Sequence, residues 1–351
     1  MGNSPPTRRK PLKILHVTGV DGGGVVDALR TYIRLQNEAV HFVAATNEIV
    51  RNDFAASGAD TLDMSGSPLR ARRVLRRYVR ERAIDVVHAH SSWGGFQARA
   101  SALGAPIIYQ PHSFYFDNPN LSRLQVLLYQ SAERLLSRRT DAFAVLTAHE
   151  ERLAAGLEPG VPLYRLHNVS KFSARHRIES RVPTSAPIVI MSGRIAPQKD
   201  PRLLRDIARE TASAGYTFVW VGDGDPTYRQ ELERAGVVVT GWLADHELHK
   251  VLAEASVYLH TAAYEGFPLA ILDAAQFGLP ILVRDANYAA DTALLTFQTV
   301  EQAVAQLGRL TTDRSWLEQA LAISAALSCQ HSDEALTRDL DRLYSSVAGV
   351  G

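Results

Sequence analysis

The sequence predicts an α/β protein made of two doubly wound, Rossmann-like domains that face each other across a cleft. Three observations predict this fold class. Short β-rich apolar runs alternate with helical patterns along the chain, a polar, proline-bearing break lies near Arg175–Pro187, and the length of 351 residues exceeds that of one ordinary domain. The alternation of strands with helices predicts parallel sheets that are covered on both faces.

In the first half, each expected strand is a short apolar run that ends in a polar or glycine-bearing loop. These runs are Lys13–Gly19, His41–Thr46, Asp85–His90, Pro106–His112, Ala142–Thr147 and Leu163–Asn168. Helical periodicity predicts helices at Leu69–Arg82 and Leu121–Arg139 between them.

In the second half, the pattern starts again with the continuous apolar run Ile188–Gly193, which is typical of a strand buried on both faces. Further strands are expected at Phe218–Gly222, Val237–Trp242, Val257–Ala262 and Pro280–Asp285. Helices are expected at Pro201–Ser213, Asp245–Ala255, Leu269–Phe277 and Asp333–Ser346.

These patterns divide the chain into four segments. We expect a disordered tail at residues 1–11, a first domain at 12–180, a second domain at 181–331 and a C-terminal helix at 332–351. That helix either ends the second domain or crosses back to the first.

Composition excludes several classes of protein. The single cysteine, Cys329, excludes a disulfide framework and a multi-cysteine zinc site. No apolar run approaches the roughly 20 residues that span a bilayer, and the polar start lacks the apolar core of a signal peptide. We therefore expect a cytoplasmic protein.

Charge is unevenly distributed, because residues 1–180 carry a net charge of +8 and residues 181–351 a net charge of −7. The first half is therefore expected to meet an anionic partner. Seven arginines lie in the helical pattern of residues 70–82, either as a solvated face or as a surface for an anionic membrane or acceptor. No aromatic residues interleave with them, so a nucleic-acid partner is not expected.

Two loops at expected strand ends could hold phosphate. Gly22, Gly23 and Gly24 follow the first strand, where backbone N–H groups and a helix N-terminus favour anions, although a plain tight turn has the same pattern. The G-x-G-x-x-G spacing of a dinucleotide site is absent, which disfavours a dehydrogenase. Arg194 and Lys199 follow the first strand of the second half, either as a clamp on a diphosphate or as solvated cations.

Two patterns raise the question of a metal. Asp223 and Asp225 form an Asp-x-Asp, but the flanking Gly222 and Gly224 favour a strand-end turn packed close to a nucleotide. His88 and His90 share one side of a strand, yet no carboxylate or cysteine cluster completes a metal site. No metal and no cofactor are therefore expected.

The most specific motif runs from Glu265 through Gly266, Phe267 and Pro268 to Leu269, with Asp273 eight residues after the glutamate. Pro268 lies near the first helical position, where its missing N–H matters least. Backbone N–H groups at this helix start would face a phosphate. The apolar neighbours of Asp273 indicate a partly buried carboxylate that needs a partner.

In combination, these motifs resemble the family-4 glycosyltransferases, which have the two-domain GT-B fold. The second half carries the family's donor-domain blocks, and the first half resembles its acceptor domain at Asp85–Ser92 and Pro111–Phe114. The resemblance extends from about Leu12 to Leu327. The blocks in the second half are Gly193-Arg194 with Lys199, Gly222-Asp223-Gly224, Thr240-Gly241-Trp242, and Glu265-Gly266-Phe267-Pro268-Leu269 with Asp273.

The resemblance implies retaining, metal-independent transfer of a sugar from a nucleotide diphosphate, with UDP favoured, to a hydroxyl acceptor. By this resemblance Arg194 and Lys199 neutralise the leaving diphosphate, Glu265 binds the donor sugar and Asp273 grips the ribose. His112 faces the donor sugar near the reacting centre. The remaining implied donor residues are Gly23, Gly24, Gly193, Gly222, Asp223, Gly224, Trp242, Leu243, Gly266, Phe267, Pro268 and Leu269. The implied acceptor residues are His90, Ser91 and Ser92.

Two departures from the family pattern bear on this assignment. Asp273 replaces the usual glutamate, and Ser113 stands where glycine usually follows the histidine. The alternatives are a nucleotide-sugar epimerase or a phosphorylase of the same fold, and a catalytically inactive partner subunit. The acceptor stays open among anionic and lipid-linked hydroxyl compounds of polysaccharide, glycolipid or natural-product glycan synthesis, and peripheral contact with the inner membrane face stays open with it.

Overall fold

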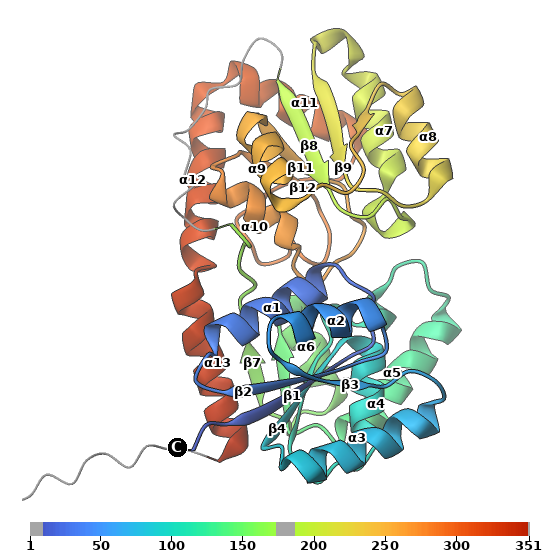
Figure 1. Cartoon of the computed structure of the whole chain (residues 1–351). Helices are drawn as coiled ribbons and strands as arrows, with labels where there is room; N and C mark the ends of the chain where they lie inside the picture. The colour runs from blue at the N-terminus through green and yellow to red at the C-terminus, as the bar shows by residue number, and fades with distance from the viewer. Residues whose placement is uncertain (1–9, 173–186, 350–351) are drawn as a thin grey trace, which may run out of the picture.

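The computed structural model describes residues 10–172 and 187–349, which form two parallel sheets with helices packed against them (Figure 1). The first sheet has seven strands in the order β3-β2-β1-β4-β5-β6-β7, and the second has six in the order β10-β9-β8-β11-β12-β13. In each sheet the first strand of the domain lies inside and the chain winds outward from it in both directions. The predicted fold class of two doubly wound α/β domains is therefore confirmed.

The first domain alternates strand and helix throughout. Its strands are β1 Lys13–Thr18, β2 Val40–Ala45, β3 Asp60–Asp63, β4 Val86–His90, β5 Ile107–Gln110, β6 Ala142–Val145 and β7 Leu163–Arg165. Its helices are α1 Gly24–Leu35, α2 Glu48–Ala56, α3 Pro68–Arg82, α4 Ser91–Arg99, the short η1 Tyr115–Asp117, α5 Arg123–Ser137 and α6 Ala148–Leu157.

The second domain follows the same plan. Its strands are β8 Ile188–Ser192, β9 Thr217–Val221, β10 Val238–Val239, β11 Val257–His260, β12 Ile281–Arg284 and β13 Leu295–Phe297. Its helices are η3 Pro197–Lys199, α7 Pro201–Glu210, η4 Ala212–Ala214, α8 Pro226–Arg234, α9 Asp245–Glu254, α10 Leu269–Gln276, α11 Val300–Thr312 and α12 Arg314–Gln330.

The differences from the expected strands lie at sheet edges and strand ends. β3 was not expected, because its sequence Asp-Thr-Leu-Asp is polar and partly exposed, as an edge strand can be. β13, also at an edge, has only three residues, too few to show a period. The expected Val237–Trp242 shrinks to two paired residues. β4 ends at His90 as expected, and the other expected strands end one to three residues early.

The final helix, α13 Asp333–Ala348, packs on the first domain. Leu336, Leu340 and Tyr344 share a buried cluster with Ile14 and Val86 of the first sheet. Figure 1 shows α12 alongside the second domain and α13 alongside the first. The C-terminal segment therefore crosses back, and the chain passes between the domains twice.

Some expectations lie outside the described residues. The expected tail falls there except for Lys10 and Pro11, and so does the break Arg175–Pro187 except for Pro187. Within the described ranges, no helix combines the length and the apolar character that a membrane span requires.

Candidate active site

Two glycines, Gly222 and Gly224, allow the loops after β8 and β9 to run against each other. A Cβ on Gly222 would lie 2.1 Å from the Gly193 carbonyl oxygen, and one on Gly224 would lie 2.2 Å from the Ile195 carbonyl oxygen. The two loops are joined by backbone hydrogen bonds from Gly193 N to the Val221 oxygen (2.9 Å) and from Ile195 N to the Asp223 oxygen (3.0 Å). These glycines therefore bring two strand ends together at the carboxyl edge of the sheet, where open α/β sheets bind ligands.

Lys199 and Glu265 meet at this edge as an ion pair, with side chains only 14% and 15% exposed. The loop that carries Lys199 is tied to the loop before Glu265, because Thr261 Oγ1 donates to the Lys199 carbonyl oxygen at 2.7 Å. Gly193 leaves room for the lysine, since a Cβ there would lie 2.8 Å from its Cε. Arg194 is exposed on the same loop, and no acidic residue in the described ranges forms an ion pair with it.

The two carboxylates of the Asp-x-Asp are occupied by neighbouring groups. Asp223 accepts from Gly224 N at 2.8 Å and pairs with Arg229 at 2.7 Å. Asp225 caps α8 by accepting from Thr227 N at 2.8 Å. These contacts account for both aspartates as loop and helix-cap residues.

Two helix N-termini from different domains approach each other beside this edge. A Cβ on Gly24, the first residue of α1, would lie 3.6 Å from Cδ1 of Leu269, the first residue of α10. Neither helix has a side-chain cap at its N-cap residue, Gly23 or Pro268. Their first backbone N–H groups therefore stay available to an anion. Pro268 is the N-cap residue directly before the helix, which starts at Leu269 as expected.

Gly266 allows the two domains to touch at His112. A Cβ on Gly266 would lie 3.0 Å from both the carbonyl carbon and the oxygen of His112. The loop after β12 supports this contact, because Asn287 Nδ2 donates to the Glu265 oxygen at 3.1 Å and to Asp117 Oδ2 at 2.6 Å. His112 thus lies beside the glutamate motif of the other domain.

The backbone at His112 and Ser113 is held in the left-handed region, with φ of 55° and 98°. Buried Glu150 fixes this turn, because its carboxylate accepts from Ser113 N at 2.5 Å and from Leu146 N at 2.7 Å. Burial raises the pKa of Glu150 to about 7, against the opposing effect of those two backbone donors. Glu150 was not predicted as a site residue, since nothing in its local sequence pattern separates it from a surface glutamate on a helix.

Asp273 is 7% exposed and has partners, as its apolar neighbours predicted. Its Oδ1 accepts from Ser170 Oγ at 2.6 Å and from Lys171 N at 3.3 Å, both in the segment that leaves the first domain. Burial raises its pKa to about 6. The aspartate therefore lies on the inner side of α10, between the second domain and the crossing chain. Its contact with ribose stays a prediction.

The other predicted residues fall into three places. Phe267 is buried and stacks on His331 at 5.0 Å between ring centroids, so it anchors the motif. Trp242 is 65% exposed after Gly241, whose carbonyl oxygen accepts from Gly222 N, and Leu243 follows it partly buried. Ser91 and Ser92 open α4 and are partly buried.

His90 requires a correction. It is fully buried and both of its ring nitrogens contact other histidines, His16 at 3.1 Å and His112 at 3.1 Å. The ring therefore does not reach the cleft, and the direct acceptor contact predicted for it is not supported. His16 was missed, although it shares a face with Ile14 and Thr18 on a strand of period two. Ligand atoms of His16, His88 and His90 lie within 4.8 Å of one another, so His16 joins the two histidines that the sequence placed on one side of a strand.

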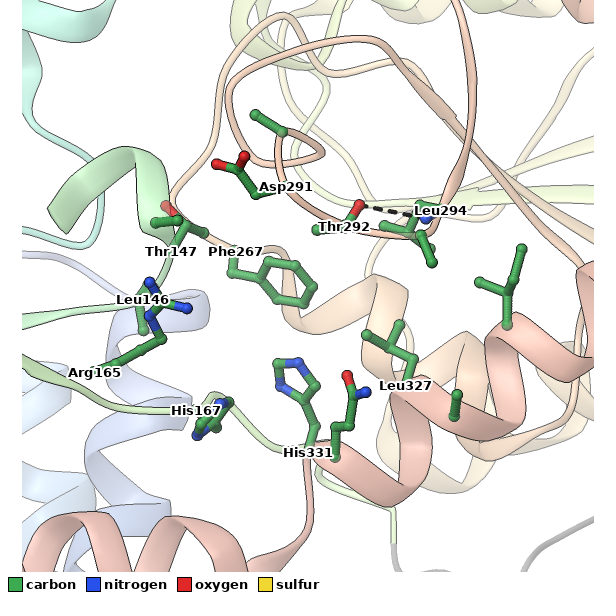
Figure 2. A pocket seen from close by; sticks show the side chains of 16 residues that line it. Leu146, Thr147, Arg165, His167, Phe267, Asp291, Thr292, Leu294, Leu327 and His331 are labelled. Carbon is green, nitrogen blue, oxygen red and sulfur yellow. Dashed lines mark hydrogen bonds between the residues drawn. The ribbon is translucent and has the colours of Figure 1, made fainter. Parts of the chain in front are cut away.

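A cavity of about 280 Å³ lies behind the motif, between the two domains (Figure 2). Phe267 projects into it above His331, and Arg165 and His167 line the side formed by the first domain. His331 Nδ1 donates to the Asn168 carbonyl oxygen at 2.7 Å. The cavity is lined by none of the predicted catalytic residues, so we assign it to the domain junction.

Family comparisons agree with this geometry. A model described as "Glycosyl transferase 4-like domain" matches residues 22–169, and one described as "Glycosyl transferases group 1" matches residues 186–313. The two matches correspond to the two domains.

Curated relatives are distant but cover most of the chain. A galactosyltransferase of Escherichia coli that is named for UDP-Gal and α-D-GlcNAc-diphosphoundecaprenol is 24% identical over 273 residues, 68% of this chain and 70% of its own. A protein from the cps region of Klebsiella pneumoniae is 22% identical over 297 residues, 78% of this chain and 81% of its own.

Solved structures share the fold. Anabaena HepE in complex with UDP-glucose matches with a TM-score of 0.78 at 15% identity, covering 95% of this chain and all of its own. Sucrose-phosphate synthase from Thermosynechococcus elongatus matches with a TM-score of 0.80 at 14% identity, covering 97% and 100%. With family models on both domains and this fold throughout, the chain belongs to the glycosyltransferases of the GT-B fold.

Proposed function

We propose that the protein is a retaining, metal-independent glycosyltransferase that moves a sugar from a UDP-sugar to a hydroxyl of a lipid-linked acceptor. One observation carries the proposal. The Lys199–Glu265 pair, the uncapped N-termini of α1 and α10, and His112 converge where the two domains touch. Two cationic features and a hydrogen-bonding carboxylate are what a sugar diphosphate requires.

The reaction places charge where this site can stabilise it. When the anomeric carbon–oxygen bond breaks, its electron pair moves to the departing phosphate oxygen. The acceptor oxygen bonds to the anomeric carbon, and its proton passes to that phosphate. Lys199, Arg194 and the helix N-termini stabilise the developing negative charge, while Glu265 accepts hydrogen bonds from the sugar hydroxyls.

Metal independence is supported by the occupied aspartates. Asp223 and Asp225 already bind backbone N–H groups and Arg229. We therefore expect full turnover after EDTA treatment. Loss of activity with EDTA and its return with Mg²⁺ or Mn²⁺ would favour a metal at the Asp-x-Asp instead.

The donor is proposed on the comparisons together with the site. HepE was solved with UDP-glucose, and the E. coli relative is named for UDP-Gal. Nucleotide sugars should be screened by thermal stabilisation, since a ligand at about 100 times its Kd adds about 2.7 kcal/mol to stability. Turnover of the hit follows, with the anomeric configuration of the product read by NMR.

That assay also separates the alternatives. An inverted product would overturn retention, and interconversion of donor sugars without acceptor would favour an epimerase. Phosphate-dependent cleavage would favour a phosphorylase, and tight donor binding without hydrolysis or transfer would favour an inactive partner subunit.

The proposal of a lipid-linked acceptor is supported by α5, a helix of the first domain that exposes its apolar face to solvent. The α5 apolar face consists of Leu124, Leu127, Leu128 and Leu135, each at least 60% exposed. On its inward side the same helix buries Ser137, packs Val126 against the core and pairs Glu133 with Arg99 at 2.8 Å, so its leucines are not what it buries. Soluble helices normally bury their leucines, so such a face indicates an interaction surface.

Charge around this face favours an anionic bilayer as its partner. Arg123, Arg134, Arg138 and Arg139 lie in or beside α5, and none forms an ion pair with an acidic residue of the described part of the chain. Leucines flanked by arginines suit the interfacial region of a membrane. The helix begins shortly after His112 and η1, and Figure 1 places it at the outer edge of the first domain.

The arginine helix α3 contributes less than its sequence suggests. Arg72 stacks on Phe96 at 4.8 Å, Arg76 donates to the Ser101 carbonyl oxygen at 2.9 Å, and Arg77 pairs with Glu81. Arg72 and Arg76 are thus held against the rest of the domain, and Arg77 is paired within its own helix. The test therefore centres on α5.

Sedimentation with phosphatidylcholine vesicles, with and without phosphatidylglycerol, tests the surface. Binding should require the anionic lipid, weaken as salt rises, and disappear when Leu127 and Leu128 are both changed to Gln. Ile49→Gln, an equally exposed apolar residue on α2, serves as the control and should bind normally. A dimer in sedimentation velocity that the double variant dissociates would show instead that the face binds a second copy of the chain.

A further inference from the structure

Four histidines form a hydrogen-bonded row that runs from the cleft through the first sheet. His112 Nε2 contacts His90 Nδ1 at 3.1 Å, and His90 Nε2 contacts His16 Nδ1 at 3.1 Å. His16 Nε2 contacts His41 Nδ1 at 3.0 Å, and His41 Nε2 contacts the Gln36 carbonyl oxygen at 2.9 Å. We call these four residues the histidine row. It joins β2, β1 and β4 to the loop that carries His112.

The far end of the row determines the direction of every hydrogen bond in it. The Gln36 carbonyl oxygen can only accept, so His41 Nε2 must carry a proton. Burial lowers the pKa of all four imidazoles, that of His112 to about 3, so each ring is neutral and carries one proton. Each Nε2 therefore donates and each Nδ1 accepts. The last ring, His112, is left with an unprotonated Nδ1.

We propose that the histidine row sets the tautomer of His112, so that this ring meets the substrate only as a hydrogen-bond acceptor. His41, three rings away, then acts as a positioning residue. The inference rests on the proposed function only where it takes His112 as a substrate contact. The direction of the row follows from its hydrogen bonds and from the neutrality of its buried rings.

An acceptor-only ring selects the kind of group it meets. Nδ1 of His112 can accept from a sugar or acceptor hydroxyl, but it offers nothing to a phosphate oxygen, a carbonyl or an ether. A hydroxyl replaced by a methoxy group would therefore leave this nitrogen without a donor, and buried polar atoms left unpaired discriminate strongly between substrates. The row thus makes His112 a neutral hydrogen-bond acceptor that is selective for hydroxyl groups, and not a cation that binds the diphosphate.

Uncharged rings pack beside the middle of the row. His88 lies against His90 with ring centroids 4.1 Å apart, and His88 Nδ1 contacts the Tyr344 hydroxyl of α13 at 2.9 Å. Tyr32 of α1 stacks on His88 at 5.9 Å. A metal ion on His16, His88 and His90 would need the bare nitrogens of these rings, so it would exclude the row.

Long-range ¹H–¹⁵N NMR of histidine-labelled protein reads the tautomers directly, with His112→Ala used to assign the His112 signals. The wild type should show a protonated Nε2 and a bare Nδ1 at His112. His41→Leu removes the acceptor for His16, so the His112 nitrogen shifts should move toward a mixture of tautomers. His41→Asn keeps an oxygen near the place of Nδ1 and should restore the wild-type shifts.

Kinetics supply the second arm. In His41→Leu the KM for the substrate that His112 reads should rise roughly threefold to tenfold, as for one neutral hydrogen bond, and His41→Asn should recover most of it. A raised KM with unchanged His112 shifts would make His41 merely structural and overturn the proposal. A protonated Nδ1 in the wild type, or a stoichiometric metal whose removal moves the His16 and His90 signals, would overturn it as well. If the wild type turns over no nucleotide sugar, the proposed function fails, while the ring shifts still decide the row.

Discussion

At the scale of single residues, charge at the cleft depends on a few side chains whose partners are now known. Lys199 is held by Glu265, whereas Arg194 is exposed on the same loop. A lysine that is already paired keeps its position before the donor arrives, and preorganised charge is what lowers the barrier of such a reaction. Both cations can then act on the same diphosphate.

We expect Lys199→Ala and Arg194→Ala each to lower kcat by about 10²–10³, the scale for losing one preorganised stabilising group. Steady-state kinetics at saturating donor measure this. Arg202→Ala is the matched control, because Arg202 lies on α7 and pairs with Glu231, outside the cleft. Near wild-type turnover in both cleft variants would refute their assigned roles.

The buried carboxyl group of Asp273 makes the stability of the protein depend on pH. Its pKa is about 6 in the folded protein and about 3.9 in an unfolded chain. Because the folded pKa is the higher one, the folded state holds a proton that the unfolded state has lost between pH 4 and 6. Stability therefore falls as pH rises through this window, and at neutral pH the protein holds a buried carboxylate.

For Asp273→Asn we expect a donor Kd raised at least several-fold, because a hydrogen bond to a charged group contributes about 1.5–3 kcal/mol. The variant should also be more stable than the wild type above pH 6, and this difference should vanish near pH 4. Calorimetric titration with a UDP-sugar and urea unfolding at several pH values measure the two effects. Donor binding as tight as that of the wild type would leave Asp273 without a ribose contact.

At the scale of elements, the turn after β5 presents His112 in a conformation that its own residues do not favour. Ser113 has φ of 98°, a region in which glycine is at ease and other residues are strained by about 1–3 kcal/mol. Glu150 compensates by accepting from Ser113 N. The serine that departs from the family pattern thus stands in a glycine conformation.

We expect Ser113→Gly to raise the free energy of unfolding by about 1 kcal/mol, since relieved strain outweighs the added freedom of the unfolded chain. Urea denaturation measures it. Ala235→Gly, where φ is −89°, is the control and should destabilise the protein. A destabilised Ser113→Gly protein would mean that the turn is not strained.

At the scale of the whole molecule, the cleft depends on how closely the domains approach. Gly266 touches the His112 backbone, and Arg152 pairs with Asp291 across the junction at 2.7 Å. The crossing chain adds a hydrogen bond from Asn168 Nδ2 to the Phe267 oxygen at 2.8 Å. Catalysis therefore requires both domains in register, because misplacement by an ångström can cost about 10²-fold in rate.

Gly266→Ala should lower kcat/KM by about tenfold or more, because the new methyl group pushes the His112 loop from the glutamate motif by a few tenths of an ångström. Gly156→Ala is the control, since nothing lies within 4 Å of its Cβ position. Kinetics of each variant are measured at the same number of degrees below its own melting temperature. Wild-type kcat/KM in Gly266→Ala would show that the contact between Gly266 and His112 tolerates a methyl group without disturbing the site.

Much of the fold could be predicted from the sequence, because strand and helix periods are local. The buried strands and the helix starting at Leu269 followed from period and composition. The polar edge strand β3 could not, since it is a strand only by virtue of its pairing with β2. The glutamate motif and Lys199 were likewise visible as local patterns at strand ends.

The sequence by itself determined the two-domain α/β architecture and the residues that are predicted to meet a nucleotide sugar. Only the tertiary structure decided which of them face the cleft. In the tertiary structure His90 is buried and contacts His16, which in turn contacts His41, and Glu150 accepts a hydrogen bond from Ser113 N. The reason is physical. A parallel sheet brings residues from distant strands into contact through its register, and neither the strand register nor the packing of the two domains follows from the local periodicity of the sequence.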